Sequence, residues 1–248
     1  FLEDLGKKLW FEVEIASADI KKIRDTLYPS ISLEELARQK RYMFFSAVCE
    51  IHETKKIMTA HHMDDKIETF FFNLARGSKL TGLINMTQNY GNVLRPLLWL
   101  QKSEILEYLD SNNLEYRIDS TNQDNDITRN HFRNEIIPKF YKVNSKFKEN
   151  ISNTLTYFEE IKNHLDEEVK KFLQEKSYFE IIDFNNLSPL IQKEVIRYIY
   201  YISNGQSTIG LSEANIWEII KYINGKNNKT IKEIKNLKMK KDGNKIYY

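Results

Sequence analysis

The segment from Lys55 to Gly77 constrains the fold of this chain more than any other stretch of its 248 residues. A short β-type run over Lys55–Ala60 precedes a helical pattern over Met63–Ala75, where apolar residues recur at the spacing i, i+3, i+4 and i+7. Gly77 lies just past the last turn, the usual position of a helix-ending glycine. Because open α/β sheets are built from strands that run directly into helices, we expect an α/β domain here.

The rest of the sequence divides into an alternating first half and a helical second half. The predicted elements are, in chain order, a strand over Leu9–Ile15, a helix capped at Ser32, a helix over Gln101–Asn112, a short strand over Leu114–Ile118, helices over Asn150–Lys176, Pro189–Tyr201 and Leu211–Ile223, and a hairpin within Thr230–Tyr248. Stretches rich in Gly, Asn and Asp at 77–92 and 119–126 predict loops. We therefore expect a Rossmann-like α/β domain with a parallel sheet at 1–145, an all-helical module at 146–224 and a short basic tail at 225–248.

Composition excludes several classes of protein. Hydrophobic residues make up 41% and charged residues 29% of the chain, which is typical of a folded globular protein rather than a disordered one. The single cysteine, Cys49, excludes an internal disulfide and any zinc or iron–sulfur site built from several cysteines. The longest apolar stretches are far shorter than the ~20 residues that span a bilayer. We therefore expect a cytoplasmic protein with no membrane partner.

Basic residues gather in two stretches of a chain whose net charge is only +2. Lys221–Tyr248 contains nine lysines against Glu233 and Asp242, which is nine minus two, or +7. Pro138–Lys148 adds four lysines and no acid. Separated basic patches suggest a polyanion such as RNA or DNA, although a solvated lysine-rich surface would give the same pattern. The lysines that we expect to contact nucleic acid are Lys139, Lys142, Lys146, Lys238, Lys240 and Lys241.

The densest set of reactive groups lies where the predicted strand meets the helix. Two histidines, two aspartates and one glutamate fall within eight residues, namely His61, His62, Asp64, Asp65 and Glu68. At 100° per residue, Asp65, Glu68, Thr69 and Arg76 lie on the side opposite the apolar stripe of Ile67, Phe70, Phe71 and Leu74. Acids in a first turn also stabilise the helix dipole, but this density of titratable groups favours a functional site.

A metal is one use for this cluster, because His61, Asp65 and Glu68 are spaced about one helical turn apart. The pattern is not His-Glu-x-x-His, so a zinc hydrolase has no motif in its support and stays an alternative. Oxygen-rich ligands suit Mg²⁺ held jointly with a nucleotide phosphate better than they suit Zn²⁺. We therefore expect Mg²⁺ to arrive with a nucleotide, and the protein ligands remain open.

A second constellation follows the acidic loop. Arg129 and Arg133 are four residues apart at a predicted helix start, so their side chains share a face. Two guanidinium groups on one face suit a carboxylate or a phosphate, whereas the plainer alternative is a pair of solvated surface arginines. Arg95, within Leu94–Leu98, is a weaker signal by itself.

Taken together, these residues resemble the tRNA(Ile)-lysidine synthetases, which are ATP-dependent enzymes of the PP-loop superfamily. The resemblance is specific over roughly residues 1–140 and is mainly architectural beyond them. The matching segments are Ala60–Thr69 (Ala-His-His-Met-Asp-Asp-Lys-Ile-Glu-Thr), Leu74–Ser78, Gly82–Leu83, Arg95–Leu98, Asp119–Asn122, Arg129–Arg133 and Ile137–Pro138, with Glu35–Tyr42 resembling the helix before the strand.

The resemblance implies a two-step ligation on an isoleucine tRNA with the anticodon CAU. ATP, with Mg²⁺, adenylylates the C2 oxygen of the wobble cytidine and pyrophosphate leaves. The side-chain amine of L-lysine then attacks C2 and AMP departs, which gives lysidine. The resemblance therefore implies a carbon–nitrogen ligase that uses ATP, L-lysine and tRNA. It does not decide whether the enzyme is a monomer or a homodimer.

Roles for individual residues follow from the same resemblance. The amine must lose a proton before it attacks, so a carboxylate base is needed, and Asp65 and Glu68 are the candidates. The residues expected in catalysis are His61, Asp65, Glu68 and Arg133. Those expected to bind ATP or substrate are His62, Asp64, Thr69, Arg76, Arg95, Asn122, Arg129 and Asn130. The lysines named above are then expected to contact tRNA.

The sequence departs from the superfamily's pattern at one motif, and this departure leaves alternative interpretations of the function. The superfamily's pyrophosphate loop, Ser-Gly-Gly-x-Asp-Ser, belongs upstream of the strand expected at Leu9–Ile15 and does not occur in the 248 residues. Because the chain starts at Phe1, we expect that the N-terminal part of the domain is missing here. The alternative is a non-catalytic tRNA-binding relative that lost the loop. A tRNA thiolase is disfavoured because sulfur transfer usually needs several cysteines.

Overall fold

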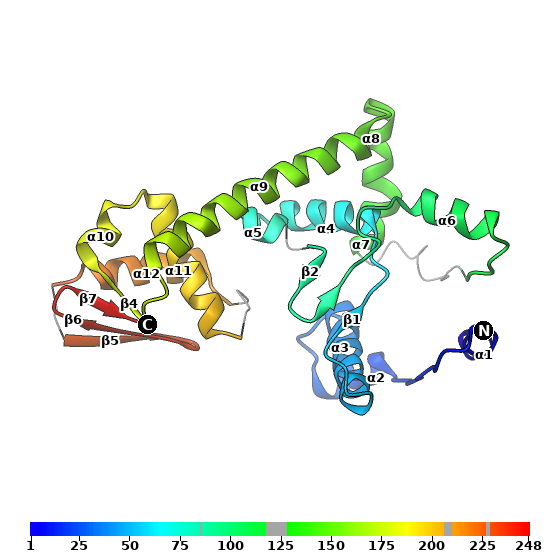
Figure 1. The fold of residues 1–248 in the computed structure, drawn as a ribbon, viewed down its shortest axis with the longest axis horizontal. Helices are drawn as coiled ribbons and strands as arrows, with labels where there is room; N and C mark the ends of the chain where they lie inside the picture. The colour runs from blue at the N-terminus through cyan, green and yellow to red at the C-terminus, as the bar shows by residue number, and fades with distance from the viewer. Residues whose placement is uncertain (85, 118–127, 206–209, 227–228) are drawn as a thin grey trace. The chain divides into compact units, whose positions relative to one another are not determined.

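The computed structural model describes residues 1–84, 86–117, 128–205, 210–226 and 229–248. Backbone contacts divide the chain into two compact units. The first unit comprises Phe1–Ser78 and Asn85–Lys148, and the second comprises Lys79–Ile84 and Glu149–Tyr248 (Figure 1). No helix in the described ranges is both long and apolar enough to cross a membrane.

The first unit contains a small mixed sheet together with several helices. Its elements are α1 (Leu2–Leu9), α2 (Ile20–Leu27), α3 (Leu33–Ile51), β1 (Ile57–Met58), α4 (Met63–Ala75), β2 (Asn89–Tyr90), β3 (Val93–Leu94), α6 (Lys102–Ser111), α7 (Thr128–His131), a π-helical segment (Phe132–Ile136) and α8 (Ile137–Val143). The strand order is β1-β3-β2, with β1 parallel to β3 and β2 antiparallel to it. The expected parallel sheet is therefore represented by one parallel pair among the described residues.

The parallel pair determines where the reactive segments meet. Ile57 pairs with Val93, and Thr59 N donates to Leu94 O at 2.9 Å, which continues the ladder past β1. Because the carboxyl ends of parallel strands share one edge, the residues after β1 and after β3 lie together there. The loop after β1 leads into α4, and Arg95 directly follows β3.

Helix α4 forms at the predicted residues because its local signals agree. Asp65 Oδ2 accepts a hydrogen bond from His62 N at 3.0 Å, which caps the first turn. Ile67 and Phe70 are buried at 1% and 6% exposure, as the apolar spacing requires. Gly77 has a φ of 74°, the left-handed conformation that glycine adopts past a helix end. The cap predicted at Ser32 is also present, because its Oγ accepts from Glu35 N at 3.2 Å.

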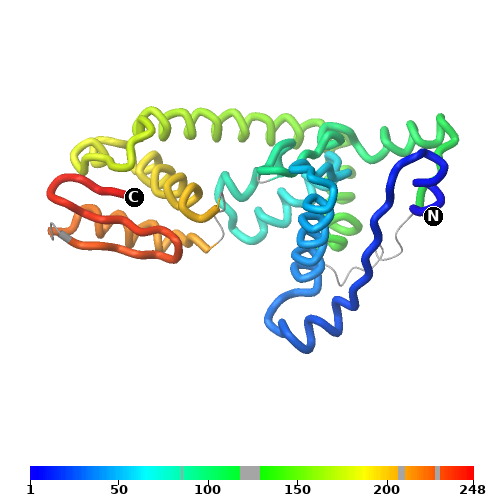
Figure 2. The backbone as a smooth tube through the Cα atoms, turned by 60° about the horizontal axis from the view of Figure 1, so that its bottom comes forward, coloured from blue at the N-terminus to red at the C-terminus, as the bar shows by residue number. Residues whose placement is uncertain are grey.

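The strands predicted near the start of the chain and after α6 do not form in the described residues. Helix α1 occupies residues 2–9, and 11–19 form an extended segment without helix or strand, visible between α1 and α2 in Figure 2. Phe11 and Ile15 are 50% and 59% exposed. Alternating polarity becomes a strand only when a neighbour supplies the backbone ladder, and no described strand pairs with this segment. Residues 114–117 are also irregular, and 118 lies outside the described residues.

The second unit was expected to be all-helical with a separate basic tail, and this expectation was wrong. Its elements are α5 (Leu80–Leu83), α9 (Phe147–Leu173, which begins in the first unit), β4 (Tyr178–Glu180), α10 (Ile181–Asn186), α11 (Pro189–Ser203), α12 (Glu213–Asn224), β5 (Lys229–Ile234), β6 (Leu237–Asp242) and β7 (Lys245–Tyr247). The predicted hairpin exists as β6–β7, with Gly243 at a φ of 59°. However, β7 also pairs with β4, so the tail completes a four-stranded antiparallel sheet in the order β4-β7-β6-β5.

One apolar core joins the helices and the sheet of the second unit. Its fully buried members include Phe184, Ile196, Tyr200, Ile219 and Ile246, each at 0% exposure. They come from α10, α11, α12 and β7, so the helices and the strands share a single core. The basic tail is therefore an integral part of this unit.

Candidate active site

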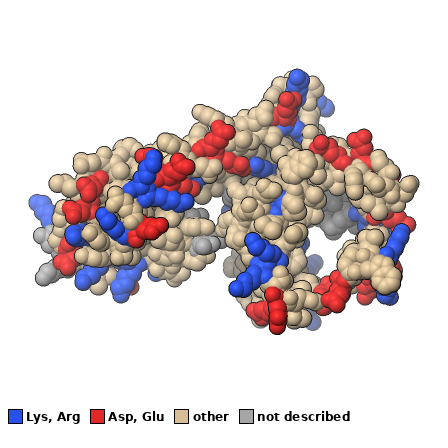
Figure 3. Space-filling view, viewed as in Figure 1, with Lys and Arg blue, Asp and Glu red and all other residues tan. Residues whose placement is uncertain are grey.

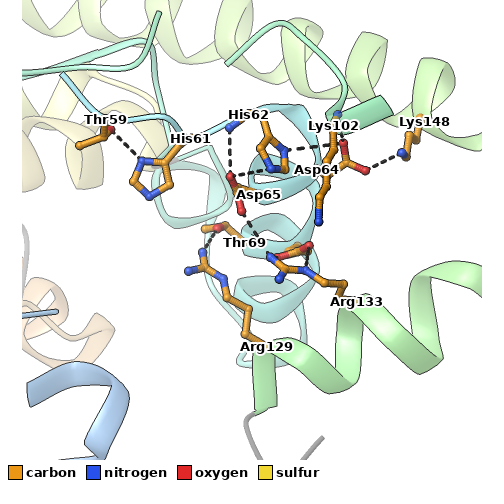
Figure 4. A network of polar contacts seen from close by, with 11 residues as sticks. Thr59, His61, His62, Asp64, Asp65, Thr69, Lys102, Arg129, Arg133 and Lys148 are labelled. Atoms are coloured by element: carbon orange, nitrogen blue, oxygen red, sulfur yellow. Dashed lines mark hydrogen bonds and ion pairs between the residues drawn. The ribbon is translucent and has the colours of Figure 1, made fainter. Parts of the chain in front are cut away.

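The predicted cluster is assembled on the first two turns of α4 (Figure 4). His61 and His62 connect β1 to this helix, and Met63 N donates to Leu100 O at 2.8 Å. Asp65 and Glu68 are one turn apart on α4, with Thr69 beside them. The structure therefore brings most of the predicted catalytic residues into one neighbourhood.

Glu68 and Arg133 form the central ion pair of this site. Arg133 Nε lies 2.6 Å from Glu68 Oε1 and its Nη2 lies 2.8 Å from Glu68 Oε2, a bidentate arrangement. The same Nη2 lies 3.5 Å from Asp65 Oδ1. Glu68 is only 2% exposed, and its burial raises its pKa although Arg133 acts in the opposite direction. The pair with Glu68 raises the pKa of Arg133 in turn.

Arg129 reaches the same face of α4 from α7. Its Nη2 donates to the hydroxyl of Thr69, and its Nη1 lies 3.9 Å from Glu34 Oε1. Asn130, next to it, is 6% exposed. The spacing argument that Arg129 and Arg133 share a face is confirmed, since one arginine contacts Thr69 and the other Glu68.

His61 lies on the other side of the cluster, beside a pocket. Its Nδ1 is 2.8 Å from Thr59 Oγ1. Burial lowers the pKa of His61, and nearby Arg95, Arg129 and Arg38 lower it further against the opposing charge of Asp65. The pKa of His61 therefore lies below the ordinary value of 6.5, which favours the neutral imidazole at pH 7.

The pocket beside His61 has a volume of about 350 Å³. Its lining includes Arg38, Arg41, Tyr42 and Phe45 of α3, together with Met58 and His61. Two arginines over an aromatic wall make a site suited to an anion attached to a flat ring system. Sequence reasoning did not single out Arg38 and Arg41. The available signal was their i, i+3 spacing on a predicted helix within the Glu35–Tyr42 segment.

Asp64 points away from its neighbour Asp65 and binds other elements. Its Oδ1 lies 2.5 Å from Lys148 Nζ, and its Oδ2 accepts from Lys102 N at 2.9 Å. Burial opposes ionisation of Asp64, but the Lys102 N–H and the Lys148 ammonium outweigh it and lower its pKa. His62 Nδ1 lies 3.7 Å from Asp64 Oδ2. The contacts of Asp64 therefore join α4 to the first turns of α6 and α9.

Of the other predicted site residues, Arg76 lies apart from the cluster, whereas Arg95 lies close enough to His61 to lower its pKa. Arg76 shares the face of Asp65, but eleven residues along a helix correspond to about 16 Å, so it falls outside the cluster. Its guanidinium lies over the Phe72 ring at 5.1 Å. Arg95 is 4% exposed and donates from Nη1 to Thr87 O at 2.7 Å. Asn122 lies outside the described residues.

The predicted nucleic-acid lysines differ in their surroundings. Lys139, Lys142, Lys146, Lys238 and Lys240 are exposed. Lys241 is 4% exposed, and its Nζ donates to Ile223 O at 2.8 Å and to Gly225 O at 2.6 Å. The prediction for Lys241 is therefore corrected, because its ammonium is used inside the second unit.

A group of three or more His, Cys, Asp or Glu residues placed to hold a metal ion is not found among the described residues. His61, Asp65 and Glu68 are therefore not such a group in this structure, and both carboxylate oxygens of Glu68 are bonded to Arg133.

The sequence also matches a known protein family over the part of the chain that holds this site. The model of the PP-loop domain matches residues 2–140, more than half of the 248 residues. The chain belongs to the PP-loop family. The α/β organisation of the first unit, with its strand–helix connection at His61 and His62, agrees with this membership.

Individual proteins with similar sequences include lysidine synthases. The bifunctional protein TilS/HprT of Listeria innocua is 32% identical over 86% of this chain and 34% of its own length. The tRNA(Ile)-lysidine synthase of Borreliella afzelii is 27% identical over 94% of this chain and 54% of its own length. The tRNA(Ile)-lysidine synthase of Bacteroides thetaiotaomicron is 36% identical over 65% of this chain and 37% of its own length. The resemblance to lysidine synthetases is confirmed, and the chain spans about a third to a half of these relatives.

Proposed function

We propose that this protein ligates L-lysine to C2 of the wobble cytidine in the CAU-anticodon isoleucine tRNA, with ATP and Mg²⁺. The observation that carries the proposal is the buried, bidentate Glu68–Arg133 pair with Asp65 beside it, next to a cationic pocket. Kinship to lysidine synthases supports the choice of reaction.

The residues around His61 suit the phosphates of ATP. Arg38 and Arg41 line the pocket, and the guanidinium of Arg129 lies close enough to lower the pKa of His61. A neutral imidazole can donate one N–H to a phosphate oxygen without adding charge. When bound, ATP supplies the adenylyl group that turns the cytidine C2 oxygen into a leaving group. Tyr42 and Phe45 offer an apolar wall for a ring system.

Asp65 is the carboxylate best suited to accept the proton of the lysine amine. Glu68 is 2% exposed and both of its oxygens accept short bonds from Arg133, so it is poorly placed to meet a substrate amine. Asp65 Oδ2 accepts from His62 N at 3.0 Å, whereas among the described residues the contact found for its Oδ1 is the longer one with Arg133, at 3.5 Å. Of the two candidates, we therefore assign the base role to Asp65 and an orienting role to the Glu68–Arg133 pair.

Magnesium fits this site best as an ion carried by the ATP phosphates. Asp64 is bound to Lys148 and to the backbone of Lys102, and Glu68 is bound to Arg133. Of the three carboxylates, Asp65 is the one whose Oδ1 has a single, long contact within the part of the chain that the structure describes. Mg²⁺ commonly takes one or two carboxylates together with phosphate oxygens and water.

A non-catalytic tRNA-binding role gains no support from this site. Lys148 and Arg133 are paired with Asp64 and Glu68, so these cations are used within the site, and a protein that only binds RNA has no use for such carboxylates. A sulfur-transfer reaction is also disfavoured, because it usually needs several cysteines and the single cysteine, Cys49, lies within α3 and is partly buried.

Lysine incorporation into tRNA tests the proposal. The full-length protein is incubated with ATP, Mg²⁺, radiolabelled lysine and a CAU-anticodon isoleucine tRNA transcript, and acid-precipitable label is counted. A transcript with uridine at the wobble position is the substrate control. Asp65→Asn should lower the rate about 10²–10⁴-fold, the usual contribution of a general base. The matched variant Asp110→Asn, on the exposed surface of α6, should leave the rate unchanged. No incorporation by the wild type, or full activity in Asp65→Asn, would contradict the proposal.

A further inference from the structure

The small sheet of the first unit fixes the backbone of Thr59. This residue directly follows β1, and its N–H donates to Leu94 O at 2.9 Å, so it continues the parallel ladder with β3. Its side chain is partly buried and lines the pocket that also contains Arg38 and Arg41. A threonine hydroxyl on a hydrogen-bonded strand end has few alternative positions, because the backbone is paired and the β-branched side chain is stiff at its first torsion.

The hydroxyl of Thr59 contacts one nitrogen of the His61 ring. Thr59 Oγ1 lies 2.8 Å from His61 Nδ1, and Figure 4 shows the two side chains pointing toward one another. Because Nδ1 is taken by Thr59, Nε2 is the ring nitrogen that remains to meet a ligand in the pocket, which His61 also lines. The sheet therefore determines, through Thr59, how the imidazole is turned.

The charge of the pocket distinguishes two proton arrangements of this contact. A neutral imidazole donates from one nitrogen and accepts with the other, and the partner of one nitrogen decides which is which. If the Thr59 hydroxyl donates to Nδ1, the proton is on Nε2, which then donates to an anion. The reverse arrangement turns the lone pair of Nε2 toward that anion and repels it.

The surroundings of His61 favour an anion in the pocket. Arg38 and Arg41 line it from α3, and Figure 3 shows basic side chains gathered around α3 and β1. A guanidinium group binds phosphate and carboxylate oxygens well. The arrangement with the proton on Nε2 is therefore the one that adds a donor to this site.

We propose that Thr59 is a positioning residue whose hydroxyl donates to His61 Nδ1 and so holds the Nε2–H toward a phosphate of the bound nucleotide. The inference rests on the proposed function for the identity of that anion, the triphosphate of ATP. Thr59 acts through His61 and makes no contact of its own with the phosphate. A ring that is already oriented loses less rotamer freedom when the nucleotide binds.

NMR of isotopically labelled histidine rings tests the proton arrangement without ligand or reaction. The full-length protein is measured at about pH 8, above the ordinary histidine pKa, and the signals of His61 are identified by their absence in His61→Ala. In the wild type, Nε2 should carry the proton and Nδ1 should show the chemical shift of a hydrogen-bond acceptor. Thr59→Val, which keeps the branched shape but lacks the hydroxyl, should lose that shift, and Thr59→Ser should keep it. A proton on Nδ1 in the wild type would overturn the inference.

Calorimetric binding of ATP with Mg²⁺, in the absence of tRNA and lysine, tests the consequence. Thr59→Val should weaken ATP binding about 2- to 13-fold, the range for the net loss of one neutral hydrogen bond, and Thr59→Ser should restore the wild-type affinity. The matched variant Thr54→Val changes an exposed threonine of the same unit and should bind ATP as the wild type does. An unchanged affinity in Thr59→Val, or an equal loss in Thr59→Ser, would count against the positioning role.

A double-mutant cycle separates positioning from direct contact, since Thr59 also lines the pocket. If Thr59 acts through His61, Thr59→Val should cause no further loss of ATP affinity in the His61→Ala background. Additive losses would mean that the hydroxyl contacts the ligand by itself, and they would refute the positioning role. The bond from Thr59 N to Leu94 O belongs to the backbone, so these variants should all keep the fold, which circular dichroism checks.

The two proposals fail in different assays. If the wild type incorporates lysine but Thr59→Val changes neither the His61 nitrogen signals nor ATP affinity, the positioning role fails and the proposed function stands. If no lysine is incorporated but the nitrogen signals and the coupling to His61 are as expected, the positioning role stands and the ligase function fails.

Discussion

Replacing Arg133 with methionine should expose the electrostatic cost of burying Glu68. Glu68 is 2% exposed and receives both of its short ionic contacts from Arg133, at 2.6 and 2.8 Å. Removing one partner of a buried pair typically costs about 3–5 kcal/mol, because the remaining charge is left uncompensated. The Arg133 side chain is 28% exposed, so water replaces part of the lost contact and we expect about 3 kcal/mol at neutral pH.

The pH dependence of this loss follows from the pKa of Glu68. Burial already raises that pKa above the ordinary 4.5, and without Arg133 it should rise further. A carboxyl with a raised folded-state pKa stabilises the fold fully below the unfolded-state value and loses that contribution as pH rises through the folded-state value. The deficit of Arg133→Met should therefore be largest at pH 7.5 and shrink toward pH 5.

Urea unfolding followed by circular dichroism at pH 7.5 and 5.0 measures the deficit. Arg24→Met is the control, because Arg24 pairs with the exposed Asp25 and such surface pairs contribute only about 0–1 kcal/mol. Arg133→Met combined with Glu68→Gln should recover most of the stability, since no buried charge remains. A deficit below about 1 kcal/mol at pH 7.5, or one equal at both pH values, would refute the reasoning.

Two further predictions concern buried titratable groups. Lys241→Met should lower the free energy of unfolding by about 1.5–3 kcal/mol, because Ile223 O and Gly225 O lose a charged donor; urea titration measures this loss. The variant should leave the salt dependence of tRNA binding unchanged, which filter binding measures at several salt concentrations. A weaker salt dependence would mean that Lys241 contacts RNA after all. Burial lowers the pKa of His61, so its contribution to stability is present above pH 6.5 and is lost as pH falls through the lower folded-state value. His61→Gln should therefore make the melting temperature less sensitive to acidification below pH 6.5, and a pH series of thermal melts with parallel curves for both proteins would contradict this.

Local patterns predicted the elements whose signals lie within a few residues. Helix α4 combines a first-turn acid cap, an apolar stripe and a following glycine, and all three act within about four turns of one helix. The shared face of Arg129 and Arg133 is likewise a property of helical spacing. The inward direction of Lys241 could also have been predicted, because it has the same parity as Leu237 and Met239 on β6.

Contacts between distant segments decided the rest. Leu9–Ile15 has the alternation of a strand, but a strand needs a partner, and the pattern of one segment does not say whether a partner is beside it. Pairing of β4 with β7 joins Tyr178 to Tyr247, and no local rule identifies partners 69 residues apart. The sequence by itself therefore determined the helix that carries the reactive groups and their order along it. Only the tertiary structure decided that Asp64 faces Lys148, that Asp65 faces Arg133 and that Arg38 and Arg41 meet His61, because long-range packing selects the partners of each side chain.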